Sequence, residues 1–188
     1  ELGFFQGALT TSQIQSLSGG NTVSSLSSGD LFAYYDFESS SMTNEAPPVY
    51  TDHSDLHDGT LSGVGSTSGV VGKAMDFTGN SDYAELGEIG EFNFLHDGTS
   101  HAVSFWLYRD GGQASSEPAV IGTQGASSSY VGTDLWFDTS NNLYYYTANG
   151  GSSSTSSAIA IPDQTWTHVI YTGDGTDVMI YVNGVLTD

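Results

Sequence analysis

Acidic side chains crowd one long stretch of the sequence, and their oxygen atoms are the ligands that a hard cation prefers. The candidate ligands are Asp36, Glu38, Asp52, Asp55 and Asp58. Calcium takes roughly six to eight oxygen ligands from carboxylates, carbonyls and water, and it tolerates adaptable loops. We therefore expect that these residues can bind calcium as a cofactor. The alternative is an acidic loop that only water solvates.

Paired carboxylates for glycoside hydrolysis must flank the scissile bond, and the sequence offers no suitable pair. Glu85, Glu88 and Glu91 are spaced three apart and are interrupted by glycine. Because alternate residues of a strand share a face, this spacing does not place them on one strand face. A Gly-x-Ser-x-Gly elbow is also absent from the sequence. We expect no enzymatic activity.

Aromatic rings that point into solvent can stack on sugar rings, and the candidates for glycan binding are Tyr130, Trp136 and Tyr145. Trp136 lies between Leu135 and Phe137, so strand alternation turns one of these faces away from the core. Tyr145 is the middle residue of a run of tyrosines. The alternative is that these rings lie in the core or at an interface between subunits.

The charge of the chain excludes several classes of partner. Lys and Arg number 2 against 22 Asp and Glu, which gives a formal net charge of −20. Such a surface repels nucleic acid and anionic membranes, and it suits a medium rich in salt or divalent cations. No apolar run approaches the roughly 20 residues of a membrane span. We expect neither nucleic-acid binding nor membrane insertion.

The sequence pattern is typical of an all-β antiparallel sandwich with a short N-terminal strand and helix. Gly and Ser/Thr clusters separate short runs rich in aromatic and β-branched residues. At the N-terminus we expect a strand, a helix capped by Thr11 or Ser12 with Ile14 and Leu17 facing inward, and a linker over Ser18–Gly29. Strands are expected at Leu31–Phe37, Lys73–Phe77, Tyr83–Leu86, His101–Tyr108, Ala119–Thr123, Asp134–Asp138, Asn142–Thr147, Ala158–Ile161, Thr167–Thr172 and Asp177–Val182.

The C-terminal residues predict a hairpin at the edge of a sheet. Val178–Val182 forms the first strand, and Asn183-Gly184 is a strong signal for a two-residue hairpin turn. The returning strand begins at Val185 and includes Leu186. A strand at a sheet edge has unpaired backbone groups that recruit other strands.

Several motifs occur in a fixed order along the chain. Gly72 to Tyr83 reads G-K-A-M-D-F-T-G-N-S-D-Y, and Val103-Ser104-Phe105-Trp106, Thr165-Trp166-Thr167-His168-Val169 and Tyr181-Val182-Asn183-Gly184 follow it. Together they resemble the laminin-G-like, concanavalin A-like jelly-roll family over about residues 30 to 186. The resemblance implies a jelly-roll sandwich, calcium near the strand ends (best matched by Glu38 and Asp58), and a packed or hydrogen-bonded role for His168.

The resemblance also divides the chain. The family normally continues beyond the Tyr-Val-Asn-Gly hairpin and ends in a strand and helix, and Glu1 to Leu17 looks like that ending. We therefore expect residues 1–29 to supply a closing strand, a short helix and a linker, and residues 30–188 to form a jelly roll without its last strands. The closing strand can belong to a preceding copy in a tandem array, close its own domain as in a circular permutant, or complete a neighbouring subunit.

We expect an array or an exchange of strands between copies, with Glu1–Phe5 beside Val178–Leu186 of another copy. The residues expected in this assembly are Leu2, Phe4, Phe5, Ile14, Leu17, Val185 and Leu186. The expected function is a non-catalytic structural or adhesion module, the repeating unit of an extracellular or cell-surface filament or adhesin, with copies of itself as partners. The alternative is a calcium-dependent carbohydrate-binding module of a secreted multidomain protein, with glycans as partners.

Overall fold

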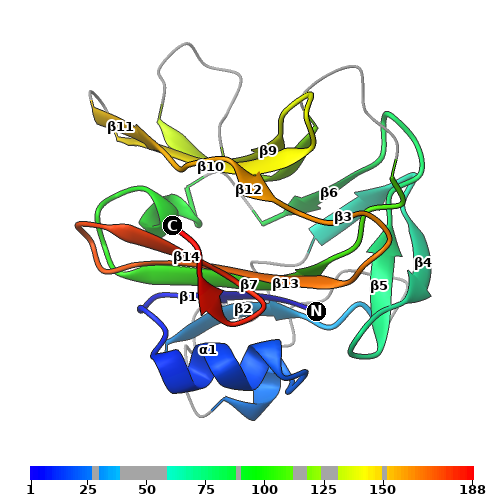
Figure 1. Cartoon of the computed structure of the whole chain (residues 1–188), viewed down its shortest axis with the longest axis horizontal. Coiled ribbons are helices and arrows are strands. Elements are labelled where there is room, and N and C mark those ends of the chain that lie inside the picture. Colours follow the sequence, from blue (N-terminus) through cyan, green and yellow to red (C-terminus); the bar gives the residue numbers. More distant parts are fainter. Residues whose placement is uncertain (27–29, 39–58, 88–89, 112–117, 124–130, 150–151) are drawn as a thin grey trace.

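Two antiparallel sheets face each other in this structure, a computed structural model (Figure 1). It describes residues 1–26, 30–38, 59–87, 90–111, 118–123, 131–149 and 152–188. The first sheet has six strands in the order β15-β14-β13-β7-β1-β2. Their bounds are β1 Leu2–Phe5, β2 Leu31–Tyr35, β7 His101–Leu107, β13 Thr167–Gly173, β14 Val178–Val182 and β15 Val185–Leu186.

The second sheet has the order β11-β10-β9-β8, with β12 also paired to β10. Its strands are β8 Ala119–Gly122, β9 Gly132–Phe137, β10 Asn142–Asn149, β11 Ser152–Thr155 and β12 Ile159–Ala160. Two further pairs join β3 (Gly59–Ser62) to β6 (Tyr83–Leu86) and β4 (Gly65–Ser68) to β5 (Lys73–Asp76), and the short 3-10 helices are η1 (Val23–Ser25) and η2 (Asn93–Leu95). The expected all-β antiparallel sandwich is confirmed.

The main core lies between the two sheets, where strand alternation turns apolar side chains toward each other. From the first sheet it contains Phe4, Val103 and Tyr171, and from the second sheet Leu135 and Leu143, all nearly without solvent exposure. Each of these residues has neighbours in its strand that face the opposite way. The pattern of alternate burial therefore sets which side chains of the second sheet face solvent.

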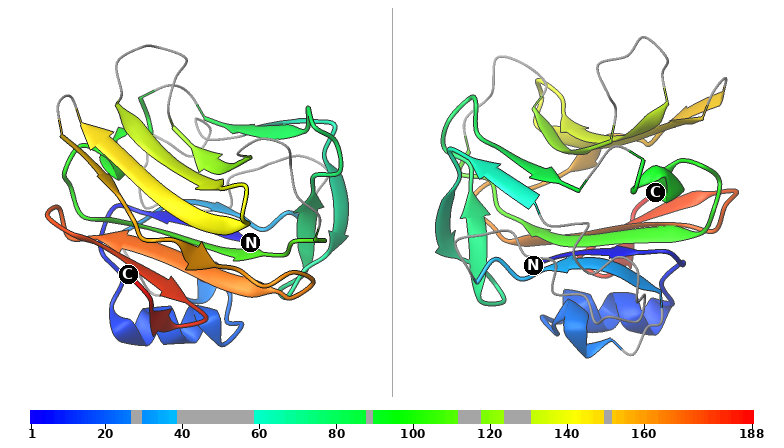
Figure 2. Two further views of the ribbon diagram at one scale, coloured as in Figure 1. Left: turned by 45° about the horizontal axis from the view of Figure 1, so that its top comes forward. Right: turned by 180° about the vertical axis from the view of Figure 1, so that it is seen from behind.

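A second apolar cluster covers the outer face of the six-stranded sheet. Helix α1 (Thr11–Ser18) lies on that face, on the opposite side from the second sheet (Figure 2). Ile14 and Leu17 are each 1% exposed, and they pack with Phe5, Ala102 and Ile170. The inward orientation predicted for Ile14 and Leu17 is confirmed. The six-stranded sheet is consequently buried on both faces along β1.

The cap of helix α1 lies one residue earlier than the sequence pattern indicates. Thr10 is the N-cap residue: its hydroxyl accepts from Gln13 N–H, and the Gln13 side chain accepts from Thr10 N–H in return. The expected caps, Thr11 and Ser12, lie in the first turn of the helix. A capping box requires a Gln or Glu three residues after the cap, which selects Thr10.

Strand β1 lies inside the six-stranded sheet, between β7 and β2 of its own chain. Leu2 is paired with Phe105 on one side and with Tyr35 on the other, and both pairings are antiparallel. The expectation placed this strand beside Val178–Leu186 of another copy, whereas within its own chain β13 and β7 separate β1 from that hairpin. The edge strands of the sheet are β15 and β2. Because β1 comes before the domain boundary expected near residue 30 and its neighbours β7 and β2 come after it, one sheet spans that boundary.

The Gly72–Tyr83 motif ends in a loop that Asp82 holds together. The Asp82 Oδ2 atom accepts hydrogen bonds from Thr78 N–H at 3.0 Å and from Gly79 N–H at 2.6 Å. Gly63 lies against the other carboxylate oxygen with φ of 73°, and a side chain there would collide with it. The carboxylate and the glycines of this motif therefore shape a turn next to β6.

Candidate functional site

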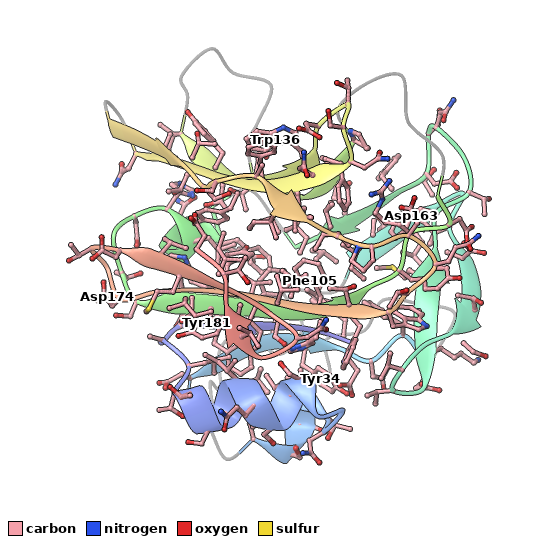
Figure 3. All side chains as sticks on the ribbon, in the orientation of Figure 1. Tyr34, Phe105, Trp136, Asp163, Asp174 and Tyr181 are labelled. Carbon is pink, nitrogen blue, oxygen red and sulfur yellow. The ribbon has the colours of Figure 1, made fainter. Side chains whose placement is uncertain are left out.

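Three aromatic side chains form a platform on the outer face of the second sheet. Trp136 belongs to β9, and Tyr144 and Tyr146 belong to β10; all three are partly exposed. Trp136 lies on the side of the second sheet that is remote from Phe105 and the core (Figure 3). We call Trp136, Tyr144 and Tyr146 the aromatic platform.

Cross-strand pairing brings the rings of the aromatic platform together. Trp136 is directly opposite Tyr144 in the ladder between β9 and β10. Their ring centroids are 5.6 Å apart with an interplanar angle of 17°, so the rings stack. Tyr146 meets Trp136 edge to face, with centroids 6.4 Å apart and an angle of 66°. Such an arrangement offers a continuous aromatic surface that carries phenol hydroxyls.

Two carboxylates lie beside the aromatic platform, and their pKa values are shifted in opposite directions. Asp134 is opposite Tyr146 in the ladder, and partial burial raises the pKa of its carboxyl group. Hydrogen bonds from Asn142, first from its backbone N–H, hold the pKa of Asp138 below its usual value, and the Tyr144 hydroxyl contributes to the same effect. Asp138 thus orients Tyr144, while Asp134 lies beside Tyr146 on the same face of the sheet.

The structure divides the predicted glycan-binding residues. Trp136 faces outward, as glycan binding requires. Tyr145 does not: it is 3% exposed, and its ring packs 4.8 Å from that of Tyr171 inside the core. The prediction that Tyr145 contacts a glycan is therefore wrong, because alternation along β10 turns it inward. Tyr130 lies outside the described residues.

Tyr145 is the residue singled out from the run Tyr144-Tyr145-Tyr146, whereas the aromatic platform contains its two neighbours. A signal for them was present, since strand alternation exposes both neighbours of a buried tyrosine together. Alternation alone does not say whether Tyr145 or its two neighbours face the core. That choice comes from Leu143, which is 1% exposed and shares the inner face with Tyr145.

The two described members of the predicted calcium site are engaged in local hydrogen bonds. Asp36 Oδ1 accepts from Glu38 N–H at 2.9 Å, and Glu38 Oε1 accepts from Lys73 N–H at 2.7 Å. Asp52, Asp55 and Asp58 lie outside the described residues. Within the described part of the chain, no group of three or more His, Cys, Asp or Glu side chains is placed to hold a metal ion. The calcium site stays a prediction.

The residues predicted to act in assembly fall into two separate places. Leu2, Phe4, Phe5, Ile14 and Leu17 are all buried within their own chain, on β1 and α1. Val185 and Leu186 are 67% and 55% exposed on the edge strand β15. The first group packs β1 and α1 against the rest of the six-stranded sheet. The second group lies at the edge of that sheet farther from β1.

His168 is packed and hydrogen-bonded, as predicted. Its side chain is 2% exposed on β13, and both ring nitrogens contact serine hydroxyls. Burial is the main reason that the pKa of His168 falls from 6.5 to about 4. The ring is therefore neutral at pH 7 and lies inside the contact between α1 and the sheet.

The comparisons with known proteins give one match. A laminin G family model, described as concanavalin A-like lectin/glucanases superfamily, matches residues 78–188, from the loop before β6 to the C-terminal hairpin. No curated protein and no solved structure matches the chain. Among the described residues, no helix is long and apolar enough to cross a membrane.

Proposed function

The chain belongs to the concanavalin A-like lectin/glucanases superfamily, and we propose that it is a non-catalytic structural or adhesion module of an extracellular or cell-surface protein. In this proposal it is a repeating unit, and copies associate by exchange of their N-terminal residues. The exchanged part is residues 1–26, with β1, α1 and η1, which we call the N-terminal unit. The position of β1 between β7 and β2 carries the proposal.

Strand β1 is a central strand contributed by one end of the sequence. Its backbone pairs with β7 along Leu2–Phe5 and with β2 along the same residues. None of these bonds depends on which copy supplies the strand, which is the condition for exchange of an identical element between copies. A β1 strand from a second copy would make the same contacts.

The slot between β7 and β2 requires an occupant. Without the N-terminal unit, β7 and β2 would each present an unpaired backbone edge, and edges of this kind recruit strands. Ala102 and Ile170, both at 0% exposure, would also lose the apolar cover that Ile14 and Leu17 provide. Filling the slot therefore stabilises the sandwich, whichever copy fills it.

A disulfide experiment tests the exchange, because the chain contains no native cysteine. Gln6 and Asp30 are exposed neighbours where β1 and β2 meet, and Gln6 N–H donates to the Asp30 carbonyl at 2.7 Å. A mixture of Gln6→Cys and Asp30→Cys chains should form disulfide-linked dimers under mild oxidation if the N-terminal unit of one copy fills the slot of another.

The matched control pairs Gln6→Cys with Thr187→Cys, an exposed position after the distant edge strand β15. That mixture should give few dimers. The double variant Gln6→Cys/Asp30→Cys reports closure within a single chain. If every link forms within single chains, and the mixed single variants give no more dimers than the control, the exchange is excluded.

A second candidate function is calcium-dependent carbohydrate binding, and the aromatic platform favours it. The partly exposed rings of Trp136 and Tyr144 present aromatic surface on which the C–H groups of a pyranose can pack, and Asp134 can accept hydrogen bonds from its hydroxyls. The net charge of −20 favours a neutral sugar over an anionic one.

Glycan-array binding and calorimetry test this second candidate. Trp136→Ala and Tyr146→Ala should each weaken binding at least tenfold, whereas Tyr83→Ala, at a 55% exposed aromatic residue on β6, should leave it unchanged. Loss of binding on calcium chelation would support the calcium dependence. Equal effects of Trp136→Ala and Tyr83→Ala would argue against the aromatic platform as the site.

A further inference from the structure

His168 joins three parts of the chain at the contact between α1 and the six-stranded sheet. Its Nδ1 atom is 2.8 Å from the Ser18 hydroxyl at the end of α1. Its Nε2 atom is 3.0 Å from the Ser104 hydroxyl on β7. Its backbone N–H donates to Asn183 Oδ1 at 2.9 Å in the turn between β14 and β15. The imidazole is thus a hydrogen-bonded link from the N-terminal unit to the sheet.

Water is excluded from this link while α1 is in place. His168 is 2% exposed, and its ring packs on Trp106 with centroids 4.8 Å apart. Ser18 covers the ring on the side of α1, and it also lies close to Gly184. A Cβ atom at Gly184 would be 3.2 Å from the Cβ of Ser18. Removal of α1 from the sheet would therefore hydrate the imidazole.

Among the described residues, the side chains that contact His168 carry no negative charge. The neighbouring side chains are uncharged: Ser18 from α1, Ser104 and Trp106 from β7, and Asn183 from the turn after β14. None of the described carboxylates contributes to the pKa of His168, and burial is the main cause of its lowering. An imidazolium ion formed here would be buried without a counter-charge, which is costly.

We propose that His168 is a proton-sensitive latch that holds the N-terminal unit on the sheet, and that acidification releases this unit. The released β1 and α1 then become available for exchange between copies, so this inference rests on the proposed exchange. The bound state requires a neutral imidazole, whereas the released state exposes the ring to water and accepts a proton readily. Protons therefore favour release by binding the open state.

The size of the effect follows from the two pKa values. The ordinary pKa of histidine is 6.5, and that of buried His168 is about 4. Above pH 6.5 both states are neutral and the latch has its full strength. As the pH falls from 6.5 toward 4, each unit shifts the equilibrium toward release by up to tenfold, or roughly 300-fold in total.

Hydrogen exchange on the intact chain tests the latch. Peptides that cover residues 11–18 report the release of α1, and peptides from β9 and β10 (residues 132–149) report the second sheet. After correction for intrinsic exchange rates, opening of residues 11–18 should rise by up to roughly 300-fold between pH 6.5 and 4. In His168→Gln, which keeps a polar side chain but cannot titrate, opening should lose this pH dependence.

Two further variants keep the test decisive if His168→Gln folds poorly. Ser18→Ala removes the partner on the helix but keeps the titrating ring, so it should raise opening at pH 7 and preserve the pH dependence. His101→Gln is the matched control, because His101 is also buried but faces the core instead of α1. This control should leave the pH dependence of α1 opening unchanged.

Two results would overturn the latch. One is the same pH dependence in the natural chain and in His168→Gln. The other is an equal rise for residues 11–18 and 132–149, which would mean unfolding of the whole sandwich. Cysteine mixtures that are incubated at pH 5 or pH 7 and then all oxidised at pH 7, where thiolate is available, separate the two proposals. Acid-dependent opening without dimers between copies would support the latch and contradict the exchange of β1.

Discussion

At the scale of single residues, the direction of a side chain decides whether its chemistry can be used. Tyr145 and its neighbours on β10 share one side-chain chemistry, yet Tyr145 is 3% exposed in the core while Tyr144 and Tyr146 lie on the aromatic platform. His168 has a side chain that can act as a base, but here it is buried and hydrogen-bonded between Ser18 and Ser104. Residue type alone therefore overestimates the number of groups that can meet a ligand.

A pH-dependent prediction concerns Asp134. Partial burial raises its pKa above the unfolded value of 3.8, so the ionised carboxylate destabilises the folded state. The sign follows from linkage: the natural chain pays this cost above pH 3.8 and is relieved of it as the pH falls and the carboxyl group binds a proton. We expect Asp134→Asn to raise the free energy of unfolding at pH 7.

Urea denaturation of Asp134→Asn and of the natural chain at pH 7 and at pH 3 checks this prediction. The stabilising difference should shrink toward zero at pH 3, where both side chains are neutral. Asp177→Asn, which removes the same charge at an exposed position, is a suitable control. If Asp134→Asn stabilises the protein less at pH 7 than at pH 3, burial does not raise the pKa of Asp134 in the folded state.

At the scale of elements, the N-terminal unit shows that local signals and long-range pairing carry different information. The capping box of Thr10 and Gln13 and the inward side chains of α1 are local features, and a pattern of this type is readable from neighbouring residues. The neighbours of β1 are not local. Phe105 pairs with Leu2 from a strand that begins at His101, far along the chain.

Ile14 tests how firmly the N-terminal unit is attached to the sheet. It is 1% exposed in the apolar cluster between α1 and the outer face of the six-stranded sheet. Ile14→Ala should lower the free energy of unfolding by about 2 to 5 kcal/mol, because it removes buried apolar contacts and leaves a cavity. Urea denaturation measures the loss.

Gln15→Ala is the control on the exposed face of the same helix, and its effect should stay within about 0.5 kcal/mol. If Ile14→Ala changes stability no more than Gln15→Ala does, then α1 is not packed on the sheet in solution. In that case the cover over Ala102 and Ile170 must be supplied by something else.

At the scale of the whole molecule, charge is the dominant property. With 22 acidic and 2 basic side chains, ion pairs cannot neutralise the surface. Arg109 illustrates the scarcity: it contacts Asp163 at 3.3 Å and also lies 4.6 Å from the ring centroid of Phe137. Most of the carboxylates must therefore depend on water, backbone N–H groups and dissolved cations.

Salt should stabilise this protein. Self-repulsion at a net charge of −20 destabilises the compact state, and the screening length falls from roughly 30 Å at 0.01 M to roughly 3 Å at 1 M ionic strength. We expect the melting temperature to rise steadily over this range in sodium chloride. Sucrose of equal osmolality is the control for effects other than charge, and an unchanged or lower melting temperature in salt would refute the expectation.

The sequence by itself determined the all-β antiparallel class, the inward face of α1 and the family resemblance, which the match over residues 78–188 supports. These properties depend on composition, on the period of two along strands and on motifs of a few residues, all of which are local. For β9 the same reasoning predicted that one face points away from the core, without choosing between Trp136 and its neighbours. It could not decide the face of the tyrosines on β10, since alternation leaves two equivalent choices until a core exists.

Only the tertiary structure decided the place of β1. The sequence showed that a closing strand was present and that an edge lay near Val185, and it suggested that the two meet. Backbone hydrogen bonds do not depend on side-chain identity, so sequence pattern cannot state which strands pair. The choice is made by burial: between β7 and β2, Phe4 enters the core, Phe5 enters the contact with α1, and both backbone edges are paired.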